Sequence, residues 1–125
     1  DTWRPYCHTF DFARAIWMIL NDTSGISKNK IYNVGNNSNN FSKKMVIEKI
    51  LKKIPDSKVT YKSMGQDRRN YKVNFNKIKK EIGFMPKFNI EDGINEILRE
   101  LKLKNYIKSD ENNNLYGNYK LISKK

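Results

Sequence analysis

The sequence predicts an α/β fold, in which short strands alternate with helices along the chain. Two patterns carry this prediction: apolar residues recur three and four positions apart in several segments, and short β-prone runs lie between these segments. The chain has 125 residues, of which 38% are hydrophobic. That length and composition suffice for one domain with a single core.

The first part of the chain is predicted to fold as a strand, a helix and a second strand. Trp3 to His8 reads as the first strand, and Thr9 or Asp11 is expected to cap the helix that follows. Lys30 to Val34 is expected to be the second strand, closed by Gly35. The apolar positions that predict one buried stripe on the helix are Phe12, Ala13, Ile16, Ile19 and Leu20.

Three further helices are predicted where a polar N-cap residue precedes an apolar stripe. The expected caps are Ser42, then Asn74 or Asn76, and finally Asn89. Pro55 is expected to end the first of these helices, and Gly83 to take the position after the second, which runs through Ile82. Val59 to Tyr61 is expected to be a strand.

The chain is expected to divide into a domain and a tail. Residues 1–104 are assigned to one α/β domain and residues 105–125 to a polar tail. Part of this tail is expected to dock, because a fully disordered tail would contain fewer aromatic residues. Because the chain opens at Asp1 on what reads as the edge of a strand, we expect it to be a piece of a longer polypeptide.

The net charge is strongly positive, with 25 Lys and Arg against 13 Asp and Glu, which gives +12. Residues 43–108 hold eighteen basic and eight acidic residues, so that +10 of the +12 lies there. Such a surface attracts nucleic acid or small phosphorylated ligands. It also fits lysines that only decorate solvent-exposed faces, and the composition leaves these alternatives open.

Composition excludes several classes of protein. The single cysteine, Cys7, rules out an internal disulfide framework, and with the single His8 it cannot form a usual four-ligand zinc site. The longest apolar run, residues 15–20, is far shorter than the roughly 20 residues of a membrane span. The glycines are too far apart for a dinucleotide-binding loop. We expect a cytoplasmic protein that does not enter a membrane.

Three segments are candidates for ligand contact, because each adjoins a predicted strand, where α/β sheets bind ligands. The first holds Arg4, which can bind a phosphate through two hydrogen bonds, with His8 and Asp11 nearby. The second is the polar loop at residues 36–40, whose amides can bind a base or sugar. The third, residues 65–71, has two adjacent arginines, one of which is expected to face a ligand. Salt bridges, helix caps and turns are the structural alternatives.

Four motifs follow one another in a specific order. They are Trp3-Arg4-Pro5-Tyr6-Cys7-His8-Thr9-Phe10-Asp11-Phe12-Ala13-Arg14-Ala15, then Ile31-Tyr32-Asn33-Val34-Gly35 with Asn40-Phe41, then Gly65-Gln66-Asp67-Arg68-Arg69-Asn70-Tyr71-Lys72-Val73, and last Ile82-Gly83-Phe84-Met85-Pro86 with Ile90-Glu91-Asp92-Gly93-Ile94. Over about residues 3–101 the chain resembles the C-terminal part of the NAD-dependent nucleotide-sugar epimerases/dehydratases, the extended short-chain dehydrogenases/reductases.

The resemblance implies the substrate-binding portion of a Rossmann-type enzyme. In that family the N-terminal half binds NAD and carries the catalytic residues, and the smaller half binds the nucleoside-diphosphate sugar. By that likeness Arg4 contacts the diphosphate and Asn40 lies by the nucleotide. Asp67 and Arg69 hold the ribose-phosphate region or order the loop around it. No catalytic, NAD-binding or metal-binding residue is assigned within this chain.

Three further residues are weaker candidates for ligand contact, because each has a structural explanation or departs from the family pattern. His8 and Asp11 fall on the strand-to-helix turn. There a role in packing or capping is expected as much as contact with a ligand. Many relatives place an arginine just before the glycine that matches Gly65, whereas this chain has Lys62 nearby. A lysine supplies a point charge there but not the same fork of hydrogen bonds.

The resemblance also implies partners. These are a nucleoside-diphosphate sugar, the missing NAD-binding half with its NAD, and a homodimer. The complete protein would be an enzyme, an isomerase or a lyase, while this portion alone is expected to catalyse nothing. The alternative is a non-catalytic basic module that binds nucleic acid or packs against a partner, supported by aromatics beside lysines such as Tyr61 and Tyr71.

Overall fold

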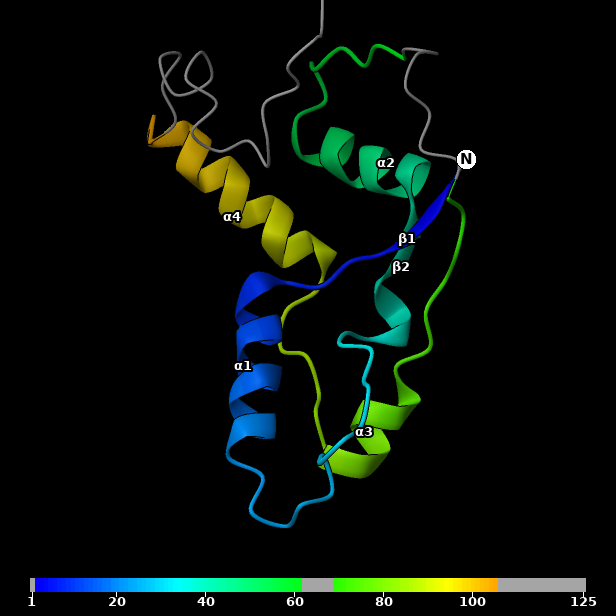
Figure 1. The fold of residues 1–125 in the computed structure, drawn as a ribbon. Helices are drawn as coiled ribbons and strands as arrows, with labels where there is room; N and C mark the ends of the chain where they lie inside the picture. Colours follow the sequence, from blue (N-terminus) through cyan, green and yellow to red (C-terminus); the bar gives the residue numbers. More distant parts are fainter. Residues whose placement is uncertain (1, 62–68, 106–125) are drawn as a thin grey trace, which may run out of the picture. The chain divides into compact units, whose positions relative to one another are not determined.

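A computed structural model of the protein describes residues 2–61 and 69–105. The contacts divide the chain into two compact units, Asp1–Gly93 and Ile94–Lys125. The elements, in chain order, are β1 (Trp3–Pro5), α1 (Thr9–Leu20), the 3-10 helix η1 (Asn37–Asn39), β2 (Asn40–Ser42), α2 (Lys43–Lys53), α3 (Asn76–Ile82) and α4 (Ile90–Lys102) (Figure 1). The α/β class is confirmed. The boundary expected at residue 104 remains a prediction, and the tail from residue 106 lies outside the described residues.

The sheet consists of β1 and β2, which run antiparallel with Trp3 opposite Ser42 and Pro5 opposite Asn40. Backbone hydrogen bonds extend the pairing at both ends, from the Lys43 N–H to the Thr2 carbonyl (3.1 Å) and from the Tyr6 N–H to the Asn39 carbonyl (2.9 Å). β1 ends at Pro5, earlier than expected, and His8 already serves as the N-cap of α1.

Two of the predicted strands do not form. Residues 30–34 and 59–61 adopt no strand in the structure. Residues 30–34 are instead held by side chains of the α3 region: Lys77 Nζ donates to the Ile31 carbonyl (2.9 Å), and Tyr32 Oη donates to Glu81 (2.7 Å). A strand needs a neighbouring strand to pair with, and among the described residues these segments have none.

Helix α1 is capped by His8, not by Thr9 or Asp11 as expected. The His8 Nδ1 atom accepts from the Phe10 N–H (3.2 Å), and the carbonyl of His8 accepts from the Phe12 N–H (3.0 Å). The carboxylate of Asp11 is thereby left for another part of the chain, and its side chain is fully buried.

The caps expected at Ser42, Gly83 and Asn89 are confirmed, but the cap expected at Asn74 or Asn76 is wrong, because Phe75 precedes α3 and makes no side-chain capping bond. Ser42 Oγ accepts from the Met45 N–H (3.3 Å) at the start of α2. Gly83 ends α3 in the left-handed conformation, with φ of 67°. Asn89 and Asp92 form a reciprocal cap at the start of α4: Asn89 Oδ1 accepts from the Asp92 N–H (3.2 Å), and Asp92 Oδ2 accepts from the Asn89 N–H (2.8 Å).

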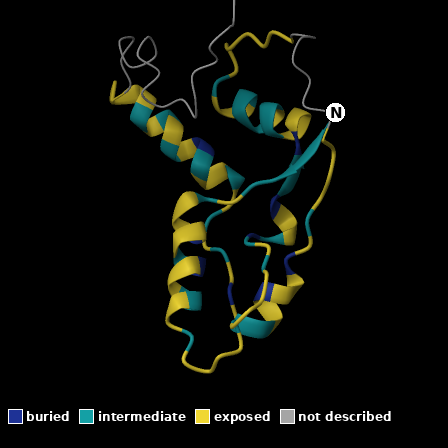
Figure 2. Cartoon of the chain, viewed as in Figure 1, coloured by how far each residue is buried: buried dark blue, intermediate teal, exposed yellow. Residues whose placement is uncertain are grey.

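The core of the first unit is small. It is formed by Ala15, Phe75, Ile78 and Phe84, with half-buried Met18, Tyr32, Val34, Val73 and Ile82 around it. The expected inward stripe of α1 is wrong, because the buried positions are Asp11 and Ala15. Figure 2 shows α1 exposed along much of its length. No helix among the described residues has the length and apolar character needed to cross a membrane.

Candidate functional site

The candidate site is built where β1 meets the segment after residue 69. Arg4 Nη1 donates to the Trp3 carbonyl (2.7 Å) and also to the backbone carbonyl of Arg69, 65 positions along the chain. The segment follows β1 through two more bonds: the Trp3 N–H donates to Asn70 Oδ1 (2.9 Å), and the Tyr71 N–H donates to the Trp3 carbonyl (3.4 Å). The structure thus brings two of the predicted segments together.

Cations and aromatic rings stack in this region. The guanidinium carbon of Arg4 lies 5.2 Å from the ring centre of Tyr71, and Lys72 Nζ lies 3.6 Å from the ring of Trp3. Such pairs are attracted by the negative face of the ring. Tyr71 lies in the third predicted segment and supports the nucleic-acid alternative. Trp3 and Lys72 were not selected as ligand contacts, although the neighbouring pairs Trp3-Arg4 and Tyr71-Lys72 were a visible signal.

Asn40 fixes the same segment further along. Its Nδ2 donates to the Val73 carbonyl (3.0 Å) and to the Asn37 carbonyl (3.0 Å), and its Oδ1 accepts from the Val73 N–H (2.9 Å). Both amide protons are therefore engaged with backbone. The predicted contact between Asn40 and a nucleotide stays a prediction, and the geometry adds a second role, the positioning of residues 69–73.

Asp11 and His8 occupy the turn into α1. The buried Asp11 carboxylate accepts from the backbone N–H groups of Lys87 (2.9 and 3.0 Å) and Phe88 (2.8 Å) and pairs with Arg14 (2.6 Å). The ring of His8 stacks on Phe88, with centroids 4.4 Å apart. His8 thus has capping and packing roles, and Asp11 holds the segment at residues 87 and 88. Contact of either side chain with a ligand stays a prediction.

The remaining predicted site residues cannot be placed. Lys62 and Asp67 lie outside the described residues, so that the segment between residues 61 and 69 contributes nothing to the geometry given above. Arg69, the first described residue after this segment, is exposed.

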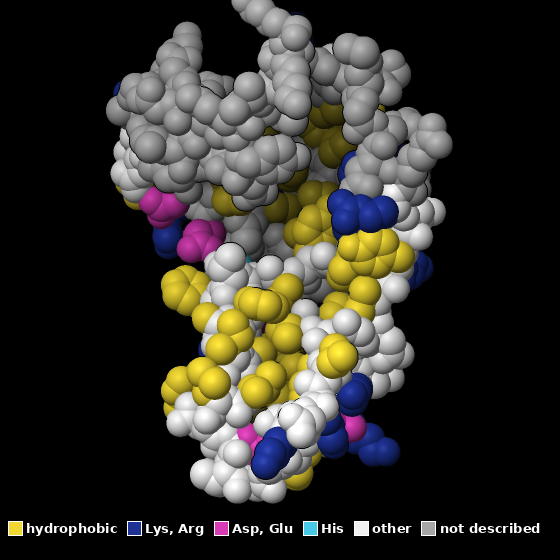
Figure 3. All heavy atoms as spheres, in the orientation of Figure 1, with side chains coloured by type: hydrophobic (Ala, Val, Ile, Leu, Met, Phe, Trp, Pro, Cys, Tyr) yellow, Lys and Arg dark blue, Asp and Glu magenta, His cyan; other side chains and the backbone are white. Residues whose placement is uncertain are grey.

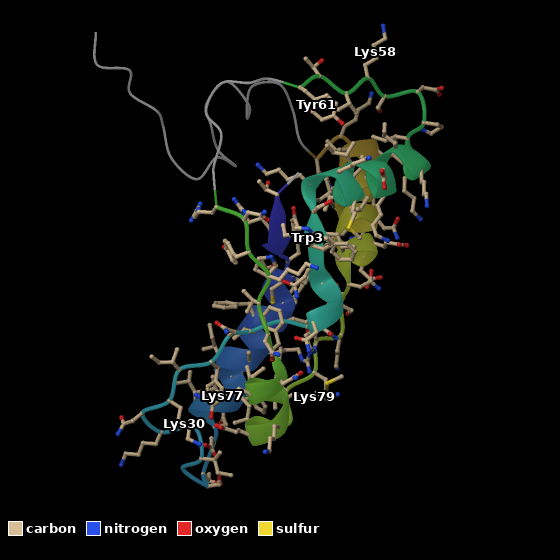
Figure 4. All side chains as sticks on the ribbon, turned by 90° about the vertical axis from the view of Figure 1, so that its right-hand side faces the viewer. Trp3, Lys30, Lys58, Tyr61, Lys77 and Lys79 are labelled. Carbon is tan, nitrogen blue, oxygen red and sulfur yellow. The ribbon has the colours of Figure 1, made fainter. Side chains whose placement is uncertain are left out.

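The basic residues of the middle segment are not gathered at Arg4. In Figure 4, Trp3 lies on β1, whereas Lys30, Lys77 and Lys79 lie around α3, and Lys58 and Tyr61 lie beyond the end of α2. Several lysines have structural contacts, such as Lys30 with Glu81 (2.9 Å) and Lys49 with Glu91 (2.6 Å). Much of the positive charge is therefore spread over the surface and is not concentrated beside Arg4.

A cavity of about 260 Å³ lies apart from these candidates, between the end of α1 and α3. Its lining residues are Met18, Asp22, Ser24, Ile26, Glu81 and Ile82. Close to it, burial and the hydrogen bond to Glu81 raise the pKa of Tyr32 to about 12. Hydrogen bonds from Ser24 and Ser27 hold the pKa of Asp22 far below its usual range, so that Asp22 organises the 22–27 loop as a carboxylate.

The described residues do not fit NAD. A dinucleotide is bound where a glycine-rich turn lets its pyrophosphate approach a helix N-terminus. Helices α1 and α2 follow the strands of the sheet, but their first turns carry Phe10 and Lys43. Within residues 2–61 and 69–105, no group of three or more His, Cys, Asp or Glu side chains is placed to hold a metal ion.

The fold and the site together define a small α/β unit that presents arginine and aromatic side chains on one strand. Residues 1–35, which include β1, Arg4 and α1, match the family model described as the NAD dependent epimerase/dehydratase family. This match supports that family for the N-terminal part of the chain. No solved structure matches the chain.

Proposed function

We propose that this chain is the nucleotide-sugar-binding part of an NAD-dependent epimerase/dehydratase, with NAD and the catalytic residues held by a half that this chain does not include. The family match over residues 1–35 supports the family. The absence of a dinucleotide-binding glycine pattern from the sequence supports the assignment of NAD to another half.

The observation that carries the proposal is the contact between Arg4 and the backbone of Arg69. It joins the segment of Arg4, which the resemblance assigns to the diphosphate, to the segment of Arg69, which the resemblance assigns to the ribose-phosphate region or to the order of the loop around it. The Arg69 guanidinium can donate two parallel hydrogen bonds to phosphate oxygens. Arg4 Nη1 donates to the carbonyls of Trp3 and Arg69, so that Arg4 contributes its positive charge beside the phosphoryl groups and holds the Arg69 segment in place. The Tyr71 ring beside Arg4 offers a flat surface to a base or sugar.

The chemistry of such a part is positioning. Binding energy from the remote nucleotide holds the sugar where a redox cofactor can react with it, which accelerates the reaction without any bond chemistry at the nucleotide. Arg4, Arg69, Asn40 and Asp67 would therefore affect substrate placement. The chain by itself is expected to bind without turnover.

Tryptophan fluorescence tests the proposal directly. The chain has two tryptophans, and Trp17→Phe leaves Trp3 as the reporter at the site. We expect UDP-glucose or dTDP-glucose to change Trp3 emission saturably, and calorimetry on the unchanged chain to give the same affinity. Free glucose serves as the control without phosphates.

The opposite result would be a saturable response to single-stranded oligo(dT) that falls steeply with salt, with no response to either nucleotide sugar. That outcome would favour the alternative of a basic nucleic-acid-binding module. This alternative is tested as well because Lys72 stacks on Trp3 and Arg4 stacks on Tyr71, and such pairs of cations and rings also suit single-stranded nucleic acid.

A further inference from the structure

A second cavity, of about 70 Å³, lies beside α3. Its walls come from three segments of the first unit: the turn at residues 35–37, α3 with the residue before it, and residues 84–86, which follow α3. A water molecule needs only about 10–15 Å³, so this cavity has room for a small ligand. It is separate from the candidate site around Arg4, and Figure 4 shows Lys79 on α3 and Trp3 on β1.

The asparagines of this cavity use their side-chain oxygens within the protein. Asn36 Oδ1 accepts from the Ser38 N–H (3.1 Å). Asn37 Oδ1 accepts from the Phe75 N–H (2.9 Å). Asn76 Oδ1 accepts from Asn37 Nδ2 (2.7 Å). Because N–H groups donate only to the oxygen of a side-chain amide, these bonds identify which end of each asparagine is its NH2 group.

The donors of the same side chains remain available. Within the part of the chain that the structure describes, no hydrogen bond occupies the NH2 groups of Asn36 and Asn76 or the ammonium group of Lys79. Asn76 and Lys79 are three positions apart on α3 and therefore lie on one face of the helix. No Asp or Glu is among the described residues that line the cavity, and Figure 3 shows Lys and Arg side chains gathered over α3. The cavity therefore offers donors and positive charge, which fit an anionic acceptor.

The remaining wall of the cavity is apolar. It includes the rings of Phe75 and Phe84, which are 5% and 1% exposed, together with Met85 and Pro86. An inorganic phosphate ion is hydrated on all sides, and contact with such a wall would remove its water without a new hydrogen bond. A carboxylate on a short hydrocarbon chain has one charged end and one apolar end, which matches both kinds of wall.

We propose that this cavity binds a small aliphatic carboxylate. The carboxylate accepts from the NH2 groups of Asn36 and Asn76 and pairs with Lys79, while the hydrocarbon end contacts Phe75 and Phe84. The site goes beyond the proposed function, because it shares no residue with the contacts assigned to the nucleotide sugar. Propionate, a ligand of about five non-hydrogen atoms, is expected to bind with a dissociation constant of about 1–10 mM.

The side-chain amide signals in NMR spectra report on the cavity directly. Sodium propionate is titrated to about 50 mM into the isotope-labelled full chain, with the ionic strength kept constant by sodium chloride. We expect the amide signals of Asn36, Asn37 and Asn76 to shift saturably, whereas sodium chloride alone or sodium phosphate shifts them little and without saturation. Equal saturation by phosphate would overturn the carboxylate as the ligand class, and the lack of a saturable shift with propionate would overturn the site.

Two pairs of matched variants separate the cavity from general positive charge. Asn76→Asp keeps the oxygen that Asn37 contacts but replaces the NH2 group with negative charge, and it should weaken propionate binding at least about tenfold. Asn74→Asp adds the same charge outside the cavity and should leave propionate binding unchanged. Lys79→Met should weaken binding about threefold, whereas Lys80→Met, also on α3 but outside the cavity, should not. Equal effects within either pair would overturn the proposal. Nucleotide-sugar binding is measured separately, so that either proposal can fail alone.

Discussion

The buried carboxylate of Asp11 accepts the backbone N–H of Lys87 with both of its oxygens, at 2.9 and 3.0 Å, across 76 positions of sequence. One oxygen also accepts the N–H of Phe88 (2.8 Å). This contact attaches the first turn of α1 to the segment that leads into α4. It also determines which side of α1 faces inward, because a buried charge must keep its hydrogen-bond partners.

Replacement of Asp11 by Asn should destabilise the chain by about 3 kcal/mol, because an amide brings one donor into a site filled with donors. Urea denaturation followed by circular dichroism measures this change. Asp56→Asn, at an exposed position after α2, is the matched control and should cost little. Equal midpoints for the two variants would mean that the Asp11 contact carries no stability.

The role of Asp11 could not be predicted from its neighbours in sequence. Position 11 follows a predicted strand, so a helix cap or a ligand contact were the natural expectations. Besides Arg14, three positions on, the groups that it binds are the backbone N–H groups of residues 87 and 88, which leave no trace in the sequence. The same contact explains why the predicted apolar stripe of α1 faces outward.

Gly35 has a specific packing role. A Cβ at this position would lie 2.7 Å from Cε1 and 2.8 Å from Cζ of Phe75, a ring in the core. Gly35→Ala should therefore destabilise the chain by about 1–3 kcal/mol through overpacking. Gly93→Ala is the contrasting variant: its Cβ would have only an ordinary contact at 3.9 Å with His8, and alanine favours a helix, so it should stabilise slightly. Thermal unfolding of both variants checks the opposite signs.

Local signals in the sequence predicted the helices well and the strands poorly. Ser42, Gly83 and Asn89 act within a few residues, so their capping roles follow from the sequence alone. Strands depend on distant partners. Residues 30–34 have the composition of a strand, yet in the described part of the chain they contact α3 through Lys77 and Glu81 instead of a neighbouring strand.

Glu81 gives the stability a predictable acid dependence. The hydrogen bonds from Lys30 and Tyr32 hold the pKa of Glu81 below its ordinary value of 4.5. A group whose pKa is lower in the folded state stabilises the fold above the ordinary value, and that stabilisation is lost as the pH falls through the folded pKa. We therefore expect the urea midpoint to fall on acidification below 4.5.

The variants of this pair isolate its share of the acid response. Glu81→Gln should make the decline of the urea midpoint with acid less steep. Tyr32→Phe should reduce the steepness of this decline only in part, because the hydrogen bond from Lys30 to Glu81 remains. Glu48→Gln, at an exposed position on α2, is the control. If Glu81→Gln and Glu48→Gln gave the same pH profile as the unchanged chain, the contact would have no part in acid stability.

The convergence of Arg4 and Arg69 follows from the sequence only through the family resemblance. Neither position has a local pattern that would place it beside the other. What joins them is a side chain on β1 and a backbone carbonyl 65 positions away. The stacking of Lys72 on Trp3 and of Arg4 on Tyr71 was not predicted for the same reason, because contact between a cation and a ring depends on how the two segments align.

The two arginines differ in what their replacement tests. Arg4→Ala removes both a candidate phosphate ligand and the hydrogen bond that holds the 69–73 segment, so a loss of binding could come from either. Arg69→Ala keeps the backbone carbonyl that Arg4 contacts and removes only the side chain. It should weaken nucleotide-sugar binding by about 1–3 kcal/mol, the cost of a lost charged hydrogen bond, without changing the urea midpoint. Arg99→Ala, which removes an equal charge from α4, should leave binding unchanged. Unaltered affinity in Arg69→Ala, or an equal loss in Arg99→Ala, would show that general positive charge and not this pair of segments attracts the ligand.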